Sequence, residues 1–246
     1  ELNATEETPM AGELLRDLLT EFRKEVEICV SLDHPNLVKF YGYTQEDPYE
    51  KSKGTGKILH LRIIQELMRG GALDHLLYTE KWAPRLVQTL KMSKDIANAM
   101  VYLHAIGDTA RDPIIHRDLK SPNLLLVEYP PKDDVPVVKI TDFGLARQKD
   151  VRDDEEMEDF RASLAGSEAA AEQARRTQMM TGCGTLYWMA PEVLKGDVYN
   201  EAVDVYAFAM CMWEMVAREV PWQSVAAVEV PFKVAIESQR PVRYFG

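Results

Sequence analysis

The chain has 246 residues, of which 46% are apolar, and its formal net charge is −11. A chain of this length and apolar content can bury one or two sizeable cores. The acidic balance argues against nucleic-acid binding, which requires clustered lysine and arginine residues.

The N-terminal part of the chain predicts one helix. Residues 1–12 are polar and expected to be frayed, and the first organised segment runs from Glu13 to Leu32. Apolar residues recur there every four positions, which indicates one face of an amphipathic helix. These residues are Leu14, Leu18, Phe22 and Val26.

Two segments of alternating polarity follow, residues 37–44 and 58–67, with a polar loop between them. This pattern predicts two paired strands. From Pro84 to His104 the apolar spacing predicts a long helix that faces the core. Its expected core residues are Leu86, Leu90, Ile96, Ala97, Met100 and Leu103.

The most informative stretch is IIHRDLKSPNLLL, residues 114–126. It places Asp118, Lys120 and Asn123 within six residues, directly before an apolar strand. Phosphoryl transfer needs a carboxylate to orient the hydroxyl nucleophile, cations to spread the phosphate charge, and oxygen ligands for magnesium. The three side chains supply these groups in order. The string alone is also compatible with a loop of hydrogen-bonded polar residues.

Motifs further along the chain favour the catalytic interpretation. Asp142 follows the strand-like VVKIT and precedes Phe-Gly, which predicts a metal-binding carboxylate next to a glycine that permits unusual backbone angles. The segment GTLYWMAPE ends at Glu192, and an apolar helix opens at Asp204. A DFG triplet alone is a weak signal. The ordered set HRDxKxxN, DFG and APE is specific.

With these motifs the chain resembles the eukaryotic protein kinases from about Glu21 to its last residues. HRDLKSPN with its lysine resembles serine/threonine kinases. GTLYWMAPE with HPNLVKFYGY is similar to the tyrosine-kinase-like group, which includes the Raf and mixed-lineage kinases. The resemblance implies an α+β, protein-kinase-like fold, with a mostly helical C-lobe in residues 69–246. Residues 13–68 would be a partial N-lobe that consists of the helix and two strands above.

The resemblance also implies the reaction and its residues. A signalling kinase of this type transfers phosphate from ATP, with Mg²⁺, to serine or threonine hydroxyls of protein substrates; dual specificity stays open. Asp118 would orient the hydroxyl and accept its proton, and Lys120 would contact the transferred phosphate. Asn123 and Asp142 would hold magnesium. Glu25 falls where the family keeps the glutamate that pairs with a strand lysine.

The nucleotide site is assigned by the same resemblance. Gln65 falls at the gatekeeper position, and Glu66 to Met68 form the hinge whose backbone groups would bind adenine. Leu125 would form the floor under the adenine ring. Glutamine departs from the commoner Thr, Met or Leu at the gatekeeper, which leaves the shape of the back pocket open.

A hydrophobic column through both lobes is a further implication. His116, Phe143, Cys29 and Phe40 fall where the family stacks this column, and Asp204 falls where the family anchors it. For each of these side chains ordinary core packing is an equally compatible role.

Four residues are assigned to regulation. Arg117 resembles the cation that meets a phosphate on the activation segment, which suggests an upstream activating kinase. Thr177 and Thr181 are the candidate phosphorylation sites. Thr185 resembles the threonine that faces the catalytic aspartate and shapes the acceptor site.

The activation segment itself is unusually long. About 50 residues separate Asp142 from Glu192, and residues 150–160 carry seven acids and one arginine, a net charge of −6. Few large apolar residues occur in residues 150–176, so this stretch is expected to be a disordered or loosely helical regulatory insert.

Two departures from the family pattern stand out. Residues 1–24 contain neither a GxGxxG hairpin nor a lysine on a strand, and Lys24 is a helix neighbour of Glu25 that cannot replace that lysine. The chain also ends at RPVRYFG, before the further helices of the family. We therefore expect a piece of a kinase domain, truncated at both ends.

Cysteine usage and hydropathy bear on location. The cysteines, Cys29, Cys183 and Cys211, are odd in number, which favours a reducing, cytoplasmic compartment over a disulfide framework. The most apolar run, residues 203–217, contains two acids, so no membrane span is expected. No signal peptide is apparent at the acidic start.

Two alternatives to an active protein kinase stay open. A catalytically impaired pseudokinase scaffold or interaction module would fit the missing lysine and glycines. A small-molecule phosphotransferase shares a similar loop and metal-binding aspartate, but GTLYWMAPE argues against it, since that segment serves to seat a peptide acceptor.

Overall fold

The computed structural model describes residues 9–46, 60–105, 113–129, 135–148 and 185–242. The predicted α+β class is confirmed, because these residues form both helices and three small sheets. None of the helices in the described part of the chain is long and apolar enough to cross a membrane.

The main helices are α1 (Pro9–Ser31), α2 (Leu86–His104), α5 (Pro191–Lys195), α6 (Ala202–Ala217) and α7 (Val230–Ala235). The strands are β1 (Phe40–Glu46), β2 (His60–Gln65), β3 (Gly71–Ala72), β4 (Ile114–Ile115), β5 (Leu124–Leu126), β6 (Val138–Ile140) and β7 (Arg147–Gln148). Short turns of helix are η1 (His75–Thr79), η2 (Ser121–Asn123), η3 (Thr185–Trp188) and η4 (Ala227–Glu229).

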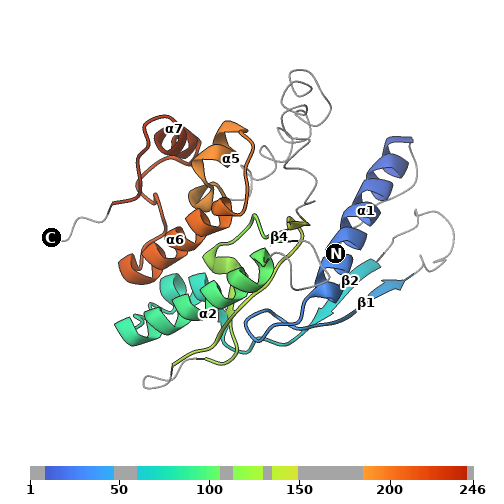
Figure 1. Cartoon of the computed structure of the whole chain (residues 1–246), viewed down its shortest axis with the longest axis horizontal. Coiled ribbons are helices and arrows are strands. Elements are labelled where there is room, and N and C mark those ends of the chain that lie inside the picture. Colours follow the sequence, from blue (N-terminus) through green and yellow to red (C-terminus); the bar gives the residue numbers. More distant parts are fainter. Residues whose placement is uncertain (1–8, 47–59, 106–112, 130–134, 149–184, 243–246) are drawn as a thin grey trace.

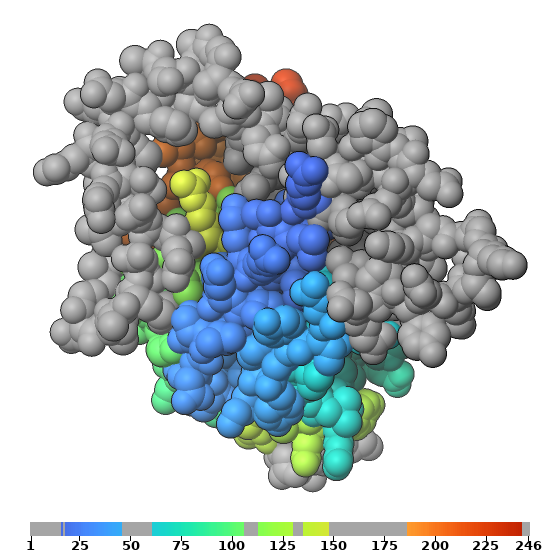
Figure 2. Space-filling model, turned by 90° about the vertical axis from the view of Figure 1, so that its right-hand side faces the viewer, coloured from blue at the N-terminus to red at the C-terminus, as the bar shows by residue number. Residues whose placement is uncertain are grey.

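The N-terminal part consists of α1 and the antiparallel pair β1 and β2, as the sequence predicted. Figure 1 shows α1 beside the two strands, and Figure 2 shows the three elements together on one face, in blue and cyan. Phe22 of α1 packs edge-on against Tyr43 of β1, with ring centroids 5.9 Å apart. The helix begins at Pro9, four residues before the expected start at Glu13. Proline fits there because the first helical residue needs no backbone N–H.

The C-terminal part is mostly helical, with α2 and α6 side by side at its centre (Figure 1). The buried stripe of α2 includes Met92, Ile96 and Leu103. The expectation that Leu86 and Leu90 face the core was wrong, since they are 72% and 57% exposed. At 3.6 residues per turn, Leu90 lies about 160° around the helix from Met92, so it points to the opposite side.

A three-stranded sheet in the order β3, β5, β6 lies between these two parts. Two glycines permit the turn into β3. A Cβ atom on Gly70 would lie 2.4 Å from the carbonyl oxygen of Glu128, and Gly71 has a φ of 74°. Any other residue at either position would meet a steric clash or a strained backbone. The turn therefore brings residues 66–68 next to the hairpin that carries Asn123.

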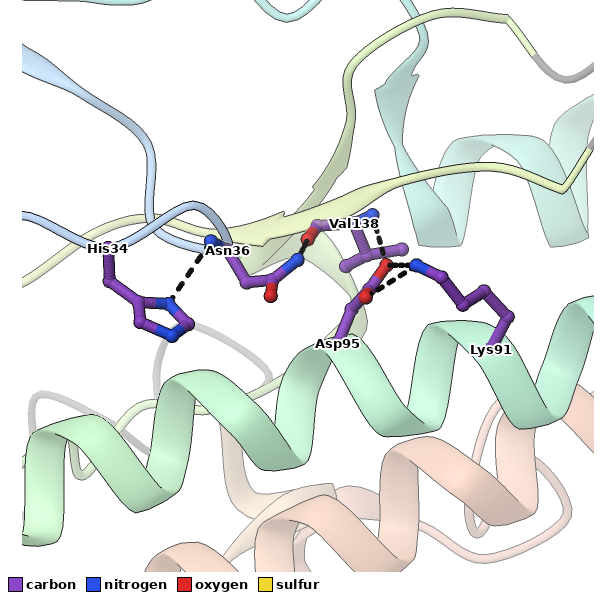
Figure 3. A network of polar contacts seen from close by, with 5 residues as sticks. All are labelled: His34, Asn36, Lys91, Asp95 and Val138. Atoms are coloured by element: carbon purple, nitrogen blue, oxygen red, sulfur yellow. Dashed lines mark hydrogen bonds and ion pairs between the residues drawn. The ribbon is translucent and has the colours of Figure 1, made fainter.

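A polar network connects the turn after α1 to α2 through β6 (Figure 3). The Asn36 side-chain amide donates to the Val138 carbonyl at 3.0 Å, and the Val138 amide donates to Asp95 at 3.3 Å. Lys91 Nζ lies 2.6 Å from both carboxylate oxygens of Asp95. The His34 ring accepts the Asn36 amide hydrogen at 3.1 Å. These bonds fix the strand that leads to Asp142.

Candidate active site

The catalytic loop between β4 and η2 is held by a buried acid from α6. Asp204 Oδ2 accepts the amide hydrogen of His116 and Asp204 Oδ1 that of Arg117, each at 2.8 Å. Asp204 Oδ2 also lies 2.8 Å from His104 Nε2 of α2. Arg117 has a left-handed φ of 64°, which costs about 1 to 3 kcal/mol unless the surroundings hold it. The two hydrogen bonds that the Asp204 carboxylate accepts stabilise this backbone conformation.

Asp118 lies 5% exposed at the centre of the loop. Lys120 Nζ is 2.8 Å from its Oδ2, and Asn123 Nδ2 donates to Oδ2 at 3.1 Å and to the Asp118 carbonyl at 2.9 Å. Asp118 Oδ1 is buried and accepts no hydrogen bond from any described residue. The structure thus brings together the three residues that the sequence predicted. It leaves one carboxylate oxygen able to accept a proton.

Asp142 follows β6 and lies beside this loop. The Thr141 amide donates to the Asn123 carbonyl at 3.1 Å, and the Thr141 carbonyl lies 3.1 Å from His116 Nε2. Asp142 has a φ of 68°, and its Oδ1 accepts the Gly144 amide hydrogen at 3.3 Å. Its exposed carboxylate is therefore presented by a backbone that is tied to the catalytic loop.

The oxygen-bearing side chains here fit a magnesium ion that is shared with a nucleotide. No three or more His, Cys, Asp or Glu side chains among the described residues are grouped to hold a metal by themselves. Magnesium in phosphoryl-transfer sites needs only one or two protein ligands, because phosphate oxygens and waters complete its shell. Asp142 and Asn123 supply the hard oxygen atoms that such an ion prefers.

Glu25 of α1 faces the same region. A Cβ atom on Gly144 would lie 3.4 Å from Asp142 Oδ1 and 3.6 Å from Glu25 Oε2, so both carboxylates border this glycine. Burial, and then the negative charge of Asp142, raise the pKa of Glu25. No ion pair of Glu25 with a described lysine or arginine occurs, so the predicted lysine partner is not among the described residues.

The predicted hinge begins with an anchored glutamate. The Glu66 amide donates to the Lys39 carbonyl at 2.8 Å, and Glu66 Oε2 lies 2.6 Å from Lys139 Nζ. Burial acts to raise the pKa of Glu66, but the bonds to Lys139 and to the Lys39 amide lower it below its usual value. The Met68 carbonyl accepts the Gly71 amide hydrogen at 3.3 Å. These contacts fix the segment in an extended form next to β3.

Leu125 occupies the middle of β5, paired with Ala72 on one side and with Lys139 on the other. It therefore lies between the strand that follows the hinge and the strand that leads to Asp142. Gln65 Oε1 lies 3.5 Å from Oγ1 of Thr141, the residue that directly follows β6. An adenine-binding role for Leu125 stays a prediction.

The Arg117 side chain has partners of its own. Its Nε donates to the Leu145 carbonyl at 2.5 Å, and a terminal nitrogen donates to the Tyr199 hydroxyl at 2.8 Å. Both acceptors are neutral. Tyr199 was not singled out from the sequence, because its contact joins residues 82 positions apart.

The other regulatory residues are only partly within the described structure. Thr185 begins η3, the turn that leads into α5. Thr177, Thr181 and the proposed insert at residues 150–176 lie outside the described residues, as does Cys183.

The expected hydrophobic column is consistent with the packing. The rings of His116 and Phe143 lie 5.1 Å apart, and both are buried. Cys29 and Phe143 belong to one core cluster, and Phe40 packs against it. Burial and the charges of Glu25 and Asp142 raise the pKa of the Cys29 thiol to about 12, so it stays protonated.

A second buried acid meets the loop at a place that the motifs did not indicate. Glu214 of α6 is fully buried and accepts hydrogen bonds from Ser121, Trp188 and Tyr78. The available signal in the sequence was one glutamate inside an otherwise apolar helix. Its partners could not be read from spacing, because they lie 26 to 136 residues away.

Comparison with known proteins gives the family. The family model described as "Protein kinase domain" matches residues 11–240. The serine/threonine-protein kinase CTR1 of Arabidopsis thaliana is 34% identical over 224 residues, 90% of this chain and 22% of that protein. Human mitogen-activated protein kinase kinase kinase 10 is 31% identical over 215 residues, 87% of this chain and 18% of that protein.

A Dictyostelium discoideum relative, named as a probable LIM domain-containing serine/threonine-protein kinase, is 32% identical over 225 residues, 91% of this chain and 27% of that protein. The chain thus spans less than a third of the length of these relatives. They are of the kind expected from the resemblance to the tyrosine-kinase-like group. The chain belongs to the protein kinase domain family.

Proposed function

We propose that the protein transfers the γ-phosphoryl group of ATP to serine or threonine hydroxyls of protein substrates. The observation that carries the proposal is Asp118, whose Oδ2 is engaged by Lys120 and Asn123 while its buried Oδ1 accepts no bond from the described residues. A buried acceptor without a donor is costly, so such atoms are uncommon away from functional sites.

Asp118 would act on the acceptor hydroxyl. Its Oδ1 would accept the hydroxyl hydrogen while the hydroxyl oxygen attacks the γ-phosphorus and the bond from phosphorus to the ADP oxygen breaks. Lys120 Nζ would stabilise the charge that builds up on the phosphoryl oxygens. Asn123 orients Asp118 through two hydrogen bonds, which limits the loss of rotational freedom in the transition state.

The nucleotide would lie between the hinge and this loop. Glu66 to Met68 and Leu125 border the adenine end, and Asn123 and Asp142 offer oxygen atoms for a magnesium ion at the phosphate end. Bound magnesium would neutralise charge on the phosphates. The two carboxylates around Gly144 fit a cation there, because burial and then the negative charge of Asp142 raise the pKa of Glu25, and a cation would offset that cost.

Serine and threonine specificity is supported by Lys120 in HRDLKSPN and by the names of two of the relatives, which describe them as serine/threonine-protein kinases. Protein substrates and an upstream activating kinase are the proposed partners. A cytoplasmic location stays a prediction; the described cysteines, Cys29 and Cys211, are buried free thiols.

The experiment is a transfer assay with the full-length protein. It would be incubated with radiolabelled ATP, magnesium and a peptide library that contains serine, threonine and tyrosine acceptors, followed by phosphoamino-acid analysis. Label on serine or threonine that disappears on chelation of magnesium supports the proposal. Asp142→Asn should raise the magnesium–ATP concentration needed, whereas Asp197→Asn, an exposed acid beyond α5, is the matched control. Absence of transfer, or label on tyrosine alone, would contradict the proposal.

A scaffold without catalysis is the second candidate. Its supporting observation is that Glu25 has no described cation partner although it lies beside Asp142. The same assay separates the two candidates when autophosphorylation is measured in the wild-type protein and in the Asp118→Asn variant. A scaffold would incorporate no label in either protein, whereas a kinase would be labelled as wild type and would lose the label in the variant.

A further inference from the structure

We propose that Tyr199 is a positioning residue that holds the Arg117 side chain against the segment directly after Asp142. Through this contact Tyr199 supports the binding of magnesium with ATP. The inference rests on the proposed kinase function. It assigns a role to a tyrosine that lies outside the catalytic and metal-binding motifs, in the connection between α5 and α6.

The Arg117 side chain connects two segments that are distant in the sequence. Its Nε donates to the Leu145 carbonyl at 2.5 Å, and its Nη1 donates to the Tyr199 hydroxyl at 2.8 Å. Leu145 lies 28 positions after Arg117, and Tyr199 lies 82 positions after it. Both acceptors are neutral oxygens, so these bonds orient the guanidinium without neutralising its charge.

The start of α6 holds both the backbone and the side chain of Arg117. Asp204, in the first turn of the helix, accepts the Arg117 amide hydrogen at 2.8 Å. Tyr199 precedes the same helix and accepts from the guanidinium. Directly after Tyr199, the Asn200 side chain accepts the Ala202 amide hydrogen at 2.9 Å, which fixes the entry into α6. The position of Arg117 is therefore set by one structural element.

The Tyr199 ring is itself fixed by a small apolar cluster. It packs against the buried side chains of Ile115, Ala190 and Val203, which come from β4, the N-cap of α5 and α6. A tyrosine side chain has few rotatable bonds, so a packed ring presents its hydroxyl oxygen at a defined point. The arginine side chain is long and flexible, and it needs such a fixed acceptor to keep one orientation.

The other end of the contact bears on the metal-binding carboxylate. Leu145 directly follows Gly144, whose amide donates to Asp142 Oδ1 at 3.3 Å. Asp142 has a left-handed φ of 68°, a conformation that persists only where the surroundings hold it. The bond from Arg117 to the Leu145 carbonyl is one such hold. Without the Tyr199 hydroxyl, the guanidinium loses its second anchor and the turn that carries Asp142 is less well fixed.

A phosphate on the activation segment would replace Tyr199 in this role. It carries about −1.5 to −2 charges and binds a guanidinium more strongly than a neutral hydroxyl does. Once a phosphate is bound, Arg117 no longer depends on Tyr199 for its orientation. The test therefore uses protein that has been treated with a phosphatase.

The test measures nucleotide binding in the full-length protein. The dissociation constant of β,γ-imido-ATP is determined by calorimetric titration with magnesium and again with a chelator, and the ratio of the two values gives the strengthening by magnesium. Tyr199→Phe removes only the hydroxyl and should lower this ratio by about 10-fold, the effect of one lost hydrogen bond to a charged group. A partly unfolded variant would bind less in both titrations, and the ratio cancels that loss.

A matched control and a double substitution complete the design. Tyr206 packs in the same cluster, and its buried hydroxyl makes no hydrogen bond with any described residue, so Tyr206→Phe should leave the ratio unchanged. Arg117→Met should lower the ratio at least as much as Tyr199→Phe does. Adding Tyr199→Phe to Arg117→Met should have no further effect, because the hydroxyl acts through the guanidinium.

The outcomes separate the proposed function from this role. A wild-type protein that binds no nucleotide would overturn both. Nucleotide binding that magnesium does not strengthen would overturn the metal-binding role of Asp142 and the role of Tyr199 with it. A wild-type ratio in Tyr199→Phe would overturn the role of Tyr199 alone, as would effects of Tyr199→Phe and Arg117→Met that simply add.

Discussion

Asp204 controls the shape of the catalytic loop without reaching its reactive end. It accepts the amide hydrogens of His116 and Arg117, and Arg117 is one of the described residues with a left-handed backbone. Hydrogen bonds to a charged acceptor contribute about 1.5 to 3 kcal/mol each. That range is comparable to the cost of the strained backbone, so the acid and the loop conformation depend on each other.

Replacing Asp204 with asparagine should therefore destabilise the fold and slow catalysis together. The amide nitrogen would face one of two backbone donors, which should lower the free energy of unfolding by about 1.5 to 3 kcal/mol. Denaturant unfolding and steady-state kinetics measure the two effects. Asp95→Asn, another buried acid that accepts a backbone amide hydrogen, is the matched control and should cost stability with less effect on kcat. Wild-type kinetics in Asp204→Asn would contradict this coupling.

Glu214 should make stability depend on pH. Its pKa is raised from 4.5 to about 7 on folding, mainly by burial, with a further contribution from Asp74. The native state therefore binds more protons than the unfolded state between these values, and stability must fall as the pH rises. Its contribution is fully present below pH 4.5 and is lost as the pH passes about 7. The shift corresponds to about 3 kcal/mol.

The measurement is the difference in unfolding free energy between wild type and Glu214→Gln from pH 5 to pH 8. Tyr78 and Cys211 also face this carboxylate, but both have raised pKa values and stay protonated in this range. Other titrating groups cancel in the difference. The wild type should lose stability relative to the variant as the pH rises; parallel profiles would show that Glu214 does not titrate there.

The grouping of the site residues was predicted well where the residues lie close together in the sequence, while their chemistry stays a prediction. Asp118, Lys120 and Asn123 meet as expected because five positions separate the first from the last. The partners of Asp204 and Glu214 were not predictable in this way. Their contacts with the catalytic loop join residues about 90 positions apart, and Glu214 also binds Trp188 and Tyr78, which lie 26 and 136 positions away. Only the packing of α6 against the rest of the fold creates these contacts.

At the scale of elements, type was predicted better than position. The helix near the start, the paired strands and the long helix before the loop all exist. The start of α1 and the core face of α2 were misjudged, since Leu86 and Leu90 are exposed apolar residues whose spacing alone does not tell which side is covered. Exposed leucines are common on protein surfaces, so the sequence alone does not distinguish them from leucines of the core.

The activation segment leads to a prediction about regulation. Arg117 is bound by the neutral oxygens of Leu145 and Tyr199, so an incoming phosphate would displace these acceptors rather than meet an unpaired cation. A phosphate carries about −1.5 to −2 charges and should still be the stronger partner. Replacing both Thr177 and Thr181 with alanine should therefore lower activity under activating conditions.

Radiolabelled peptide assays on the full-length protein check this prediction. Thr20→Ala, at an exposed site on α1, is the matched control. Deletion of residues 150–176 should raise basal activity if the acidic stretch competes for Arg117. If the double threonine variant is as active as wild type, the switch lies elsewhere in the chain.

At the scale of the whole molecule, the site lies where two differently built parts meet. α1 with β1 and β2 forms one part, the helices around α6 form the other, and the β5–β6 hairpin connects them (Figure 1). Polar contacts through Asn36, Asp95 and Glu66 fix this junction. The residues proposed for magnesium and for the acceptor hydroxyl are therefore held by the same hairpin and loop.

The most direct test of the account is the kinetics of Asp118→Asn in the full-length protein. Because Asp118 would act on the acceptor hydroxyl and not on the nucleotide, kcat should fall by about 10²- to 10⁴-fold, while the dissociation constant for magnesium–ATP stays close to that of the wild type. Asp197→Asn should leave both values unchanged. A wild-type kcat in Asp118→Asn, or a loss of nucleotide binding that accounts for the whole effect, would contradict the assignment of Asp118 as the residue that orients the acceptor.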